Sequence, residues 1–172
     1  CTAVIKPSEM TPGTTLLLGG ILKEAGLPDG VVNILSGYGD PVGMTLSESN
    51  NVDMITFTGS TAVGKHIMRA AATNLKKVEL ELGGKNPQII FPDANIDELI
   101  DPVVFGIYFN MGECCNSGSR IIIHKDIVDE FIEKLVAHTK KVKVGDPLDP
   151  TVKMGAIIND MQYDKIIGYI KS

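Results

Sequence analysis

Two hydrophobic periods alternate along this chain. Short runs of β-branched residues are followed by segments in which apolar residues recur every three or four positions. The first pattern is typical of buried strands and the second of amphipathic helices. The predicted strands span residues 1–5, 31–35, 54–58, 78–81, 88–91 and 120–124, and the predicted helices 12–25, 42–49, 60–72, 96–109, 127–144 and 160 onward. This alternation predicts an α/β fold, in which helices cover a mainly parallel sheet.

The ends and faces of these helices carry further expectations. Thr11 is expected to cap the first helix, with Pro12 in its first turn and Gly26 as its stop. The helices that start near residues 127 and 160 should each bury an apolar stripe. These stripes consist of Ile127, Val128, Phe131, Ile132, Leu135 and Val136, and of Tyr163, Ile166, Ile167 and Ile170.

A glycine pair, Gly83 and Gly84, separates two of the predicted strands. Because glycine has no side chain, the pair allows a bend or the close approach of a ligand. We therefore expect two domains, residues 1–83 and 84–172. The chain also begins without Met in a strand-like run and stops within a helical pattern, so we expect it to be part of a longer protein.

Composition and charge exclude several classes of function. The 172 residues are 44% hydrophobic and 22% charged, as in globular proteins. Sixteen Lys and Arg against 21 Asp and Glu give a net charge of −5, which argues against nucleic-acid and anionic-membrane partners. No apolar run is long enough for a membrane span, and no signal peptide is recognisable. Three cysteines cannot all pair, which favours a reducing, cytoplasmic location.

Two adjacent thiols, Cys114 and Cys115, lie in a polar loop predicted between a helix and a strand. A thiol that attacks a carbonyl carbon needs a base to activate water for release of the product. Glu81, beside the glycine pair, is the candidate base. Two alternatives stay open, because cysteines are often inert buried residues and a glutamate is usually a solvated surface charge.

The residues 59–66 follow a predicted strand and open a predicted helix, so their backbone N–H groups offer an anion site. A nucleotide-binding P-loop would need Ser or Thr where His66 stands. Lys6 and Glu9 end the first strand, where a carboxylate can accept ribose hydroxyls. Two alternatives stay open: residues 59–66 can be a helix start that binds no ligand, and Lys6 and Glu9 can be a surface ion pair. The histidines share no metal-ligand spacing, so no metal site is expected.

Four short motifs resemble those of one family, the aldehyde dehydrogenases. They are KPSE at 6–9, FTGS at 57–60, ELGGK at 81–85 and NMGECC at 110–115, in the order of the family and close to its spacing. Residues 144–147 and 154–155 also look like family landmarks, so the resemblance covers essentially the whole chain. It implies a Rossmann-like cofactor domain in residues 1–83 that continues into the α/β catalytic domain in 84–172, both incomplete.

The resemblance also implies roles for individual residues. The separation of 115 − 81 = 34 residues matches Cys115 to the nucleophile, which would form a thiohemiacetal and then a thioester. Glu81 matches the base that activates the hydrolytic water. The cofactor contacts implied are Lys6 and Glu9 at the adenosine ribose, Ser60 at the pyrophosphate, Val63 near the adenine, and Leu82 and Gly83 beside the nicotinamide. Phe109, Cys114 and Asn116 match positions at the substrate tunnel.

The expected cofactor is NAD, because the charge of Glu9 would repel the 2′-phosphate of NADP, although dual use is possible. The expected substrate is a small-molecule aldehyde, and the complete protein should be a homodimer or homotetramer. Met111, Glu113 and the pair Asn116-Ser117 depart from the usual family residues. The family's oxyanion asparagine and the carboxylate that orients the nicotinamide ribose have no counterpart in residues 1–172, so we expect these residues alone to be inactive. The alternatives are a non-catalytic structural relative and a P-loop-like phosphate-binding module.

Overall fold

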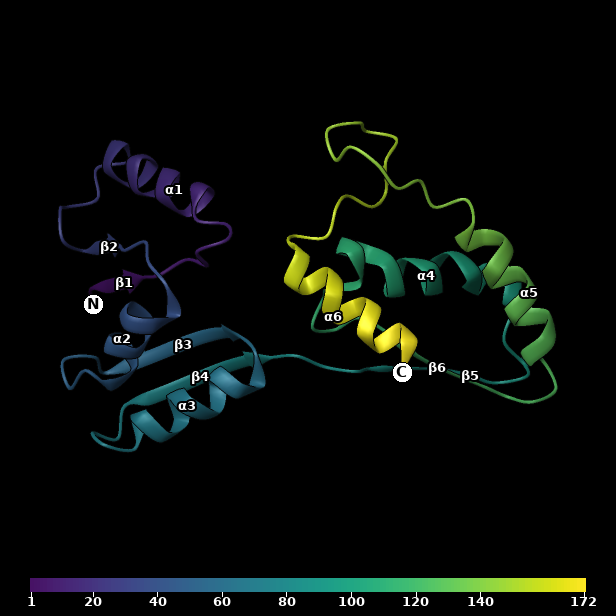
Figure 1. Ribbon diagram of the computed structural model, residues 1–172, viewed down its shortest axis with the longest axis horizontal. Coiled ribbons are helices and arrows are strands. Elements are labelled where there is room, and N and C mark those ends of the chain that lie inside the picture. Colours follow the sequence, from purple (N-terminus) through teal and green to yellow (C-terminus); the bar gives the residue numbers. More distant parts are fainter. The chain divides into compact units, whose positions relative to one another are not determined.

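Six strands pair two by two, and a helix joins the partners of each pair. The computed structural model describes residues 1–172, which divide into two units, residues 1–81 and 82–172 (Figure 1). The strands are β1 (Ala3–Ile5), β2 (Val32–Ile34), β3 (Met54–Gly59), β4 (Lys77–Leu82), β5 (Pro87–Ile90) and β6 (Arg120–Ile123). The helices are α1 (Gly13–Glu24), α2 (Met44–Glu48), α3 (Thr61–Ala71), α4 (Ile96–Tyr108), α5 (Val128–Thr139) and α6 (Asp160–Lys171). The predicted α/β fold class is confirmed.

The pairing follows the chain order of the elements. β1 pairs with β2 in parallel, with Ala3 opposite Val32, and β5 pairs with β6 in parallel. In the β3–β4 pair the N–H of Lys77 donates to the carbonyl oxygen of Asp53 at 3.0 Å, so both strands begin at the same end. Parallel partners need a crossover connection, and α1, α3 and α4 supply it.

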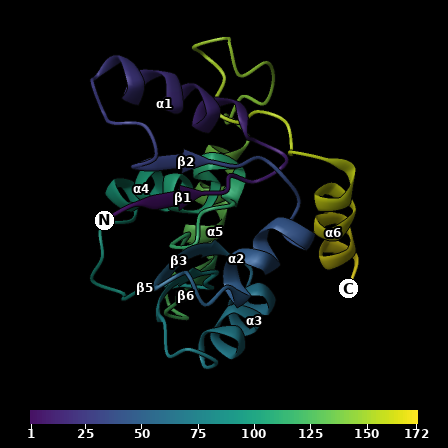
Figure 2. The ribbon, with the colours of Figure 1, turned by 90° about the vertical axis from the view of Figure 1, so that its left-hand side faces the viewer.

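The first unit buries few side chains. α1 lies along β2 in both ribbon views (Figures 1 and 2), yet none of its residues is buried, and Leu17 is 70% exposed. α3 buries Ile67 and Ala71. Lys76 is buried too, and its Nζ donates to the carbonyl oxygens of Ser47 and Ser49 at 2.8 and 2.7 Å. This ammonium therefore caps the carboxyl end of α2, where cations are favourable.

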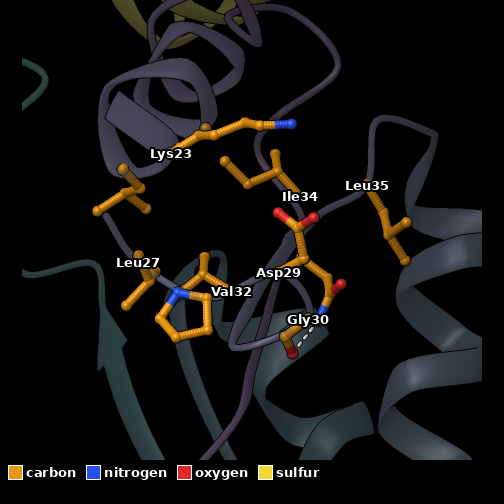
Figure 3. A pocket seen from close by; sticks show the side chains of 11 residues that line it. Lys23, Leu27, Asp29, Gly30, Val32, Ile34 and Leu35 are labelled. Carbon is orange, nitrogen blue, oxygen red and sulfur yellow. Dashed lines mark hydrogen bonds between the residues drawn. The ribbon is translucent and has the colours of Figure 1, made fainter. Parts of the chain in front are cut away.

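A cavity of about 350 Å³ opens between α1 and β2 (Figure 3). Its walls include Lys23, Leu27, Asp29, Val32, Ile34 and Leu35. At its edge the side-chain amide of Asn33 donates to the carbonyl oxygen of Gly30 at 3.0 Å. None of the site residues expected from the sequence lines this cavity.

The second unit contains the larger hydrophobic core. The core consists of Ile90, Ile96, Ile100, Val103, Val104 and Phe131. Phe131 of α5 is fully buried and fills the space between α4 and the β5–β6 pair. At the rim, Lys134 Nζ lies 2.6 Å from Asp97 Oδ1, and His138 Nε2 lies 2.7 Å from Asp101 Oδ1. The bond from Asp97, followed by that from Glu130, raises the pKa of Lys134.

Several expectations about the helices are wrong. Pro12, not Thr11, occupies the cap position of α1 without a side-chain cap, because a turn held by Ser8 precedes it. α5 ends at Thr139, well before residue 144. In its predicted stripe Ile132 and Val136 are 49% and 46% exposed. The helix α6 buries no residue fully, and in its predicted stripe Tyr163 and Ile170 are 53% and 74% exposed, whereas Ile166 and Ile167 are half-buried. None of the helices combines the length and hydropathy required to cross a membrane.

Candidate active site

The two adjacent thiols lie between the end of α4 and the start of β6. A short 3₁₀ turn, Phe109–Gly112, follows α4 directly and leads into Cys114 and Cys115. Cys115 is exposed and Cys114 half-buried, and both are free thiols. The Sγ of Cys114 lies 4.0 Å from the carbonyl oxygen of Phe109. The structure therefore presents Cys115, rather than its neighbour, to solvent.

The turn before the thiols is conformationally strained. Asn110, Met111 and Gly112 have φ angles of 49°, 57° and 76°, which places three successive residues in the left-handed region. Such a conformation costs a non-glycine residue about 1–2 kcal/mol. Asn and Gly tolerate it, but the sequence carries no signal for a left-handed Met111. Strain of this kind is often found at functional sites, where the surrounding structure holds it in place.

Buried hydrogen bonds hold the loop that follows the thiols. The hydroxyl of Ser117, which is buried, donates to the carbonyl oxygen of Gly106 at 2.9 Å. The N–H of Gly118 donates to the same carbonyl at 3.0 Å. The last turn of α4 therefore anchors residues 117 and 118. Ser117 departs from the usual family pattern, and no local sequence pattern predicts its structural role.

A second set of bonds joins the loop to β5. The amide of Asn86 donates to the carbonyl oxygen of Cys115 at 2.9 Å and that of Ser117 at 3.3 Å, and the amide of Gln88 donates to that of Gly118 at 2.8 Å. Asn86 and Gln88 are two positions apart, so they project from the same face of an extended chain. Neither residue was expected from the sequence. The only local pattern that marks Asn86 and Gln88 is the alternation of polar residues after the glycine pair.

The residues matched to the substrate tunnel lie close to the thiols. Phe109 stacks at a tilt of 39° on Phe105, with ring centroids 4.9 Å apart. The two side chains are 55% and 63% exposed, so they form an open aromatic surface at the end of α4. Asn116, directly after Cys115, is exposed as well. Phe109, Cys114 and Asn116 therefore belong to one loop region.

Glu81 occupies the penultimate position of β4. It lies on the exposed face of the strand with Lys77 and Glu79, whereas Leu82 is half-buried. Gly83, which follows the strand, is exposed and has no neighbour within 4 Å of the position where a Cβ would stand. Glu81 belongs to the first unit, and Leu82, Gly83 and Cys115 belong to the second.

Lys6 and Glu9 lie at the carboxyl end of β1. Lys6 Nζ is 3.5 Å from Glu9 Oε2, and it also donates to the carbonyl oxygens of Pro7 and Gly37 at 2.7 and 2.9 Å. Gly37 follows β2, so the ammonium bridges the ends of two paired strands. A hydrogen bond from its own backbone lowers the pKa of Glu9; the charge of Lys6 acts in the same direction, and together they outweigh desolvation.

Ser60 forms the cap of α3 directly after β3. Its hydroxyl accepts a hydrogen bond from the N–H of Val63 at 3.3 Å. The N–H groups of Thr61 and Ala62 have no partner within the helix and remain available to an anion. Val63 is 45% exposed beside this helix start.

A dinucleotide needs acceptors for its ribose hydroxyls and donors for its pyrophosphate. Glu9 offers a carboxylate at the end of one strand, and the helix start at Ser60 offers N–H donors at the end of another. Ligands of open α/β sheets bind beyond the carboxyl ends of the strands. The residues present therefore fit a dinucleotide. No cluster of three or more histidine, cysteine, aspartate or glutamate side chains is arranged to hold a metal ion.

Comparisons with known proteins cover the whole chain. Residues 1–172 match the aldehyde dehydrogenase family. Retinal dehydrogenase 2 from Taeniopygia guttata is 49% identical over 172 residues, which are 99% of this chain and 33% of that protein. The crystal structure of an NAD-dependent aldehyde dehydrogenase from Sinorhizobium meliloti superposes with a TM-score of 0.97 at 47% identity, covering 99% of this chain and 34% of the other. Betaine aldehyde dehydrogenase from Staphylococcus aureus in complex with NAD+ superposes with a TM-score of 0.96 at 42% identity. The superposition covers 99% of this chain and 34% of that one. The chain spans about a third of the length of these relatives.

Proposed function

The chain belongs to the aldehyde dehydrogenase family, and on this premise we propose that it carries the nucleophile, the base and part of the NAD site of an enzyme that oxidises an aldehyde to a carboxylic acid. The observation that carries the proposal is the exposed Cys115 in a loop anchored on both sides by hydrogen bonds. In this proposal residues 1–83 belong to the cofactor domain and residues 84–172 to the catalytic domain.

The nucleophile is Cys115. Its thiolate attacks the carbonyl carbon of the aldehyde, forms a C–S bond and gives a thiohemiacetal. The backbone N–H of Cys115 donates to the oxygen that becomes negative in this step. When bound, NAD supplies the acceptor for the hydride that leaves this carbon. Cys115 then holds the acyl group as a thioester until water releases the acid.

Glu81 is the proposed base. Its carboxylate accepts a proton from the water that attacks the thioester, so the acid leaves and the thiol of Cys115 is regenerated. Glu81 is exposed on β4, which keeps its carboxylate accessible to water. Phe109, Cys114 and Asn116 line the path of the aldehyde in this proposal.

The cofactor contacts follow from the strand ends. Glu9 accepts the hydroxyls of the adenosine ribose, Lys6 donates beside it, and the N–H groups at the helix start of Ser60 bind the pyrophosphate. Val63 contacts the adenine side, and Leu82 and Gly83 lie beside the nicotinamide. NADP is disfavoured because its 2′-phosphate would approach the negative charge of Glu9.

The setting of the complete protein is also proposed. It is cytoplasmic, forms a homodimer or homotetramer, and has neither nucleic-acid nor membrane partners. Residues 1–172 by themselves are proposed to be inactive, because they correspond to about a third of the length of the relatives.

The test is an assay of aldehyde-dependent NADH formation. The complete natural protein, supplied with NAD and a panel of aldehydes, is expected to produce NADH and one equivalent of acid. Residues 1–172 expressed alone are expected to produce none. Absence of activity in the complete protein with every aldehyde, together with NAD binding, would favour a non-catalytic relative of the family.

A further inference from the structure

The carbonyl oxygen of Cys115 is held by residues near the start of β5. The Nδ2 of Asn86 donates to this oxygen at 2.9 Å. A Cβ on Gly84 would lie only 2.5 Å from the same oxygen. The close approach expected at the glycine pair therefore occurs at Gly84, and the group that approaches is a carbonyl of the chain itself.

The bond from Asn86 extends the β5–β6 ladder into the loop. The N–H of Arg120, at the start of β6, donates to the backbone carbonyl of Asn86 at 3.3 Å. The Nε of Arg120 donates to the carbonyl of Lys85 at 2.8 Å. The side chain of Asn86 then reaches past the end of the ladder to the carbonyls of Cys115 and Ser117. A rigid parallel pair is thereby linked to the residue that carries the thiol.

We propose that Asn86 is a positioning residue that sets the orientation of Cys115 for attack on the aldehyde. This inference rests on the proposed function, because it takes Cys115 as the nucleophile. A side-chain amide has two N–H donors, and Asn86 uses its amide nitrogen for two carbonyls on either side of Asn116. Two bonds restrain the peptide that follows Cys115 and hence the direction of its Cα–Cβ bond. The residues that precede Cys115 include the left-handed Asn110 and Met111, so the restraint from Asn86 acts on the other side of the thiol.

The test uses four variants of the complete natural protein. In Asn86→Ala the rate of NADH formation in the first turnover at saturating aldehyde, called here the burst rate, should fall about 10- to 100-fold, as for a misplaced reactive group, while the KM for NAD stays near the wild-type value. Asn86→Asp keeps the shape of the side chain, but its carboxylate cannot donate a hydrogen bond to the two carbonyl oxygens. This variant should therefore be at least as slow as Asn86→Ala. Asn86→Gln keeps the amide donor and should recover part of the burst rate. An Asp variant as fast as the wild type overturns the donor role.

Gln88→Ala is the matched control, because it removes another amide-to-carbonyl bond of the same loop, at Gly118. It should leave the burst rate close to wild type. If Gln88→Ala slows the burst as much as Asn86→Ala, general loosening of the loop explains both results and the specific role of Asn86 is overturned.

Hydrogen exchange separates this inference from the proposed function. Measured without aldehyde or NAD, the amides of residues 115–119 should exchange faster in Asn86→Ala than in the wild type, with the rest of the second unit unchanged. Equal exchange contradicts the inference even if the enzyme is active. Conversely, a wild-type protein without aldehyde oxidation contradicts the proposed function whatever the exchange shows.

Discussion

Lys6 and Glu9 form an ion pair, with 3.5 Å between Nζ and Oε2 at the end of β1. The Lys6 side chain is largely covered, at 16% exposure, whereas the Glu9 side chain is 39% exposed. Two backbone carbonyls hold the ammonium in place. The carboxylate is thus the accessible member of the pair, and the selectivity between cofactors should depend on it.

Glu9→Gln should reduce the preference for NAD. The amide is uncharged, so the 2′-phosphate of NADP meets no repulsion, while the bonds to the ribose hydroxyls of NAD weaken. The measurement is the ratio of kcat/KM for NAD to that for NADP in the complete protein. A wild-type preference for NADP would contradict the assignment of Glu9 to the ribose.

The same carboxylate predicts a dependence of NAD affinity on pH. Its pKa lies below the ordinary value of 4.5, so Glu9 stays charged throughout the neutral range and is protonated only as the pH falls through the lowered pKa. NAD affinity should therefore be constant above the ordinary value and weaken at more acidic pH. Glu9→Gln should lack this weakening, which equilibrium titration with NAD can check.

Cys115→Ala should lower aldehyde oxidation by roughly 10³-fold or more, as expected when a nucleophile is removed. Cys114→Ala should keep most of the activity, because that thiol is half-buried and its Sγ faces the carbonyl of Phe109. The assay is NADH formation at saturating aldehyde and NAD. Full activity in Cys115→Ala together with inactivity of Cys114→Ala would reverse the assignment of the nucleophile.

Glu81→Gln should slow steady-state turnover by about 10²- to 10⁴-fold, the usual effect of losing a general base. Binding of NAD should change little. If release of the acid becomes limiting, a burst of NADH precedes the slow phase and the thioester on Cys115 can be detected by mass spectrometry. The neighbouring Glu79→Gln, on the same face of β4, is the control and should stay active.

Phe131→Ala should destabilise the second unit by about 3–5 kcal/mol, since it empties a fully buried position of the core. Ile132→Ala, one residue further along α5, removes a side chain that is 49% exposed and should cost much less. Urea denaturation followed by hydrogen exchange of the core amides gives both values. An equal loss in the free energy of unfolding for the two variants would show that the core is not centred on Phe131.

Elements with local signals were predictable from the sequence. The helix predicted at 96–109 is observed at Ile96–Tyr108, and the strand predicted at 120–124 is observed at Arg120–Ile123. Hydrophobic period and polar punctuation act within a few residues, so a single sequence reveals them. The family motifs, which are contiguous, were recognisable for the same reason.

Features that depend on distant partners were not predictable. The bond between Asn86 and Cys115 spans 29 positions of the chain, and no local pattern indicates which carbonyl an amide will reach. The exposure of Tyr163 and Ile170 on α6 has a similar cause, because a helical stripe specifies a face but not whether another element covers it. The left-handed Met111 is imposed by its surroundings and not by its own preference.

The order of the two units along the chain has a consequence for synthesis. The strands β1 to β4 pair with one another and all lie within residues 3–82. The ribosome therefore synthesises both strands of each pair before it reaches Cys115. Domains generally fold as units, the N-terminal one first. We therefore expect the strands β1 to β4 and the helix start at Ser60 to leave the exit tunnel before the loop that contains Cys115. The oxidisable cysteine would then emerge after both strand pairs have been able to form.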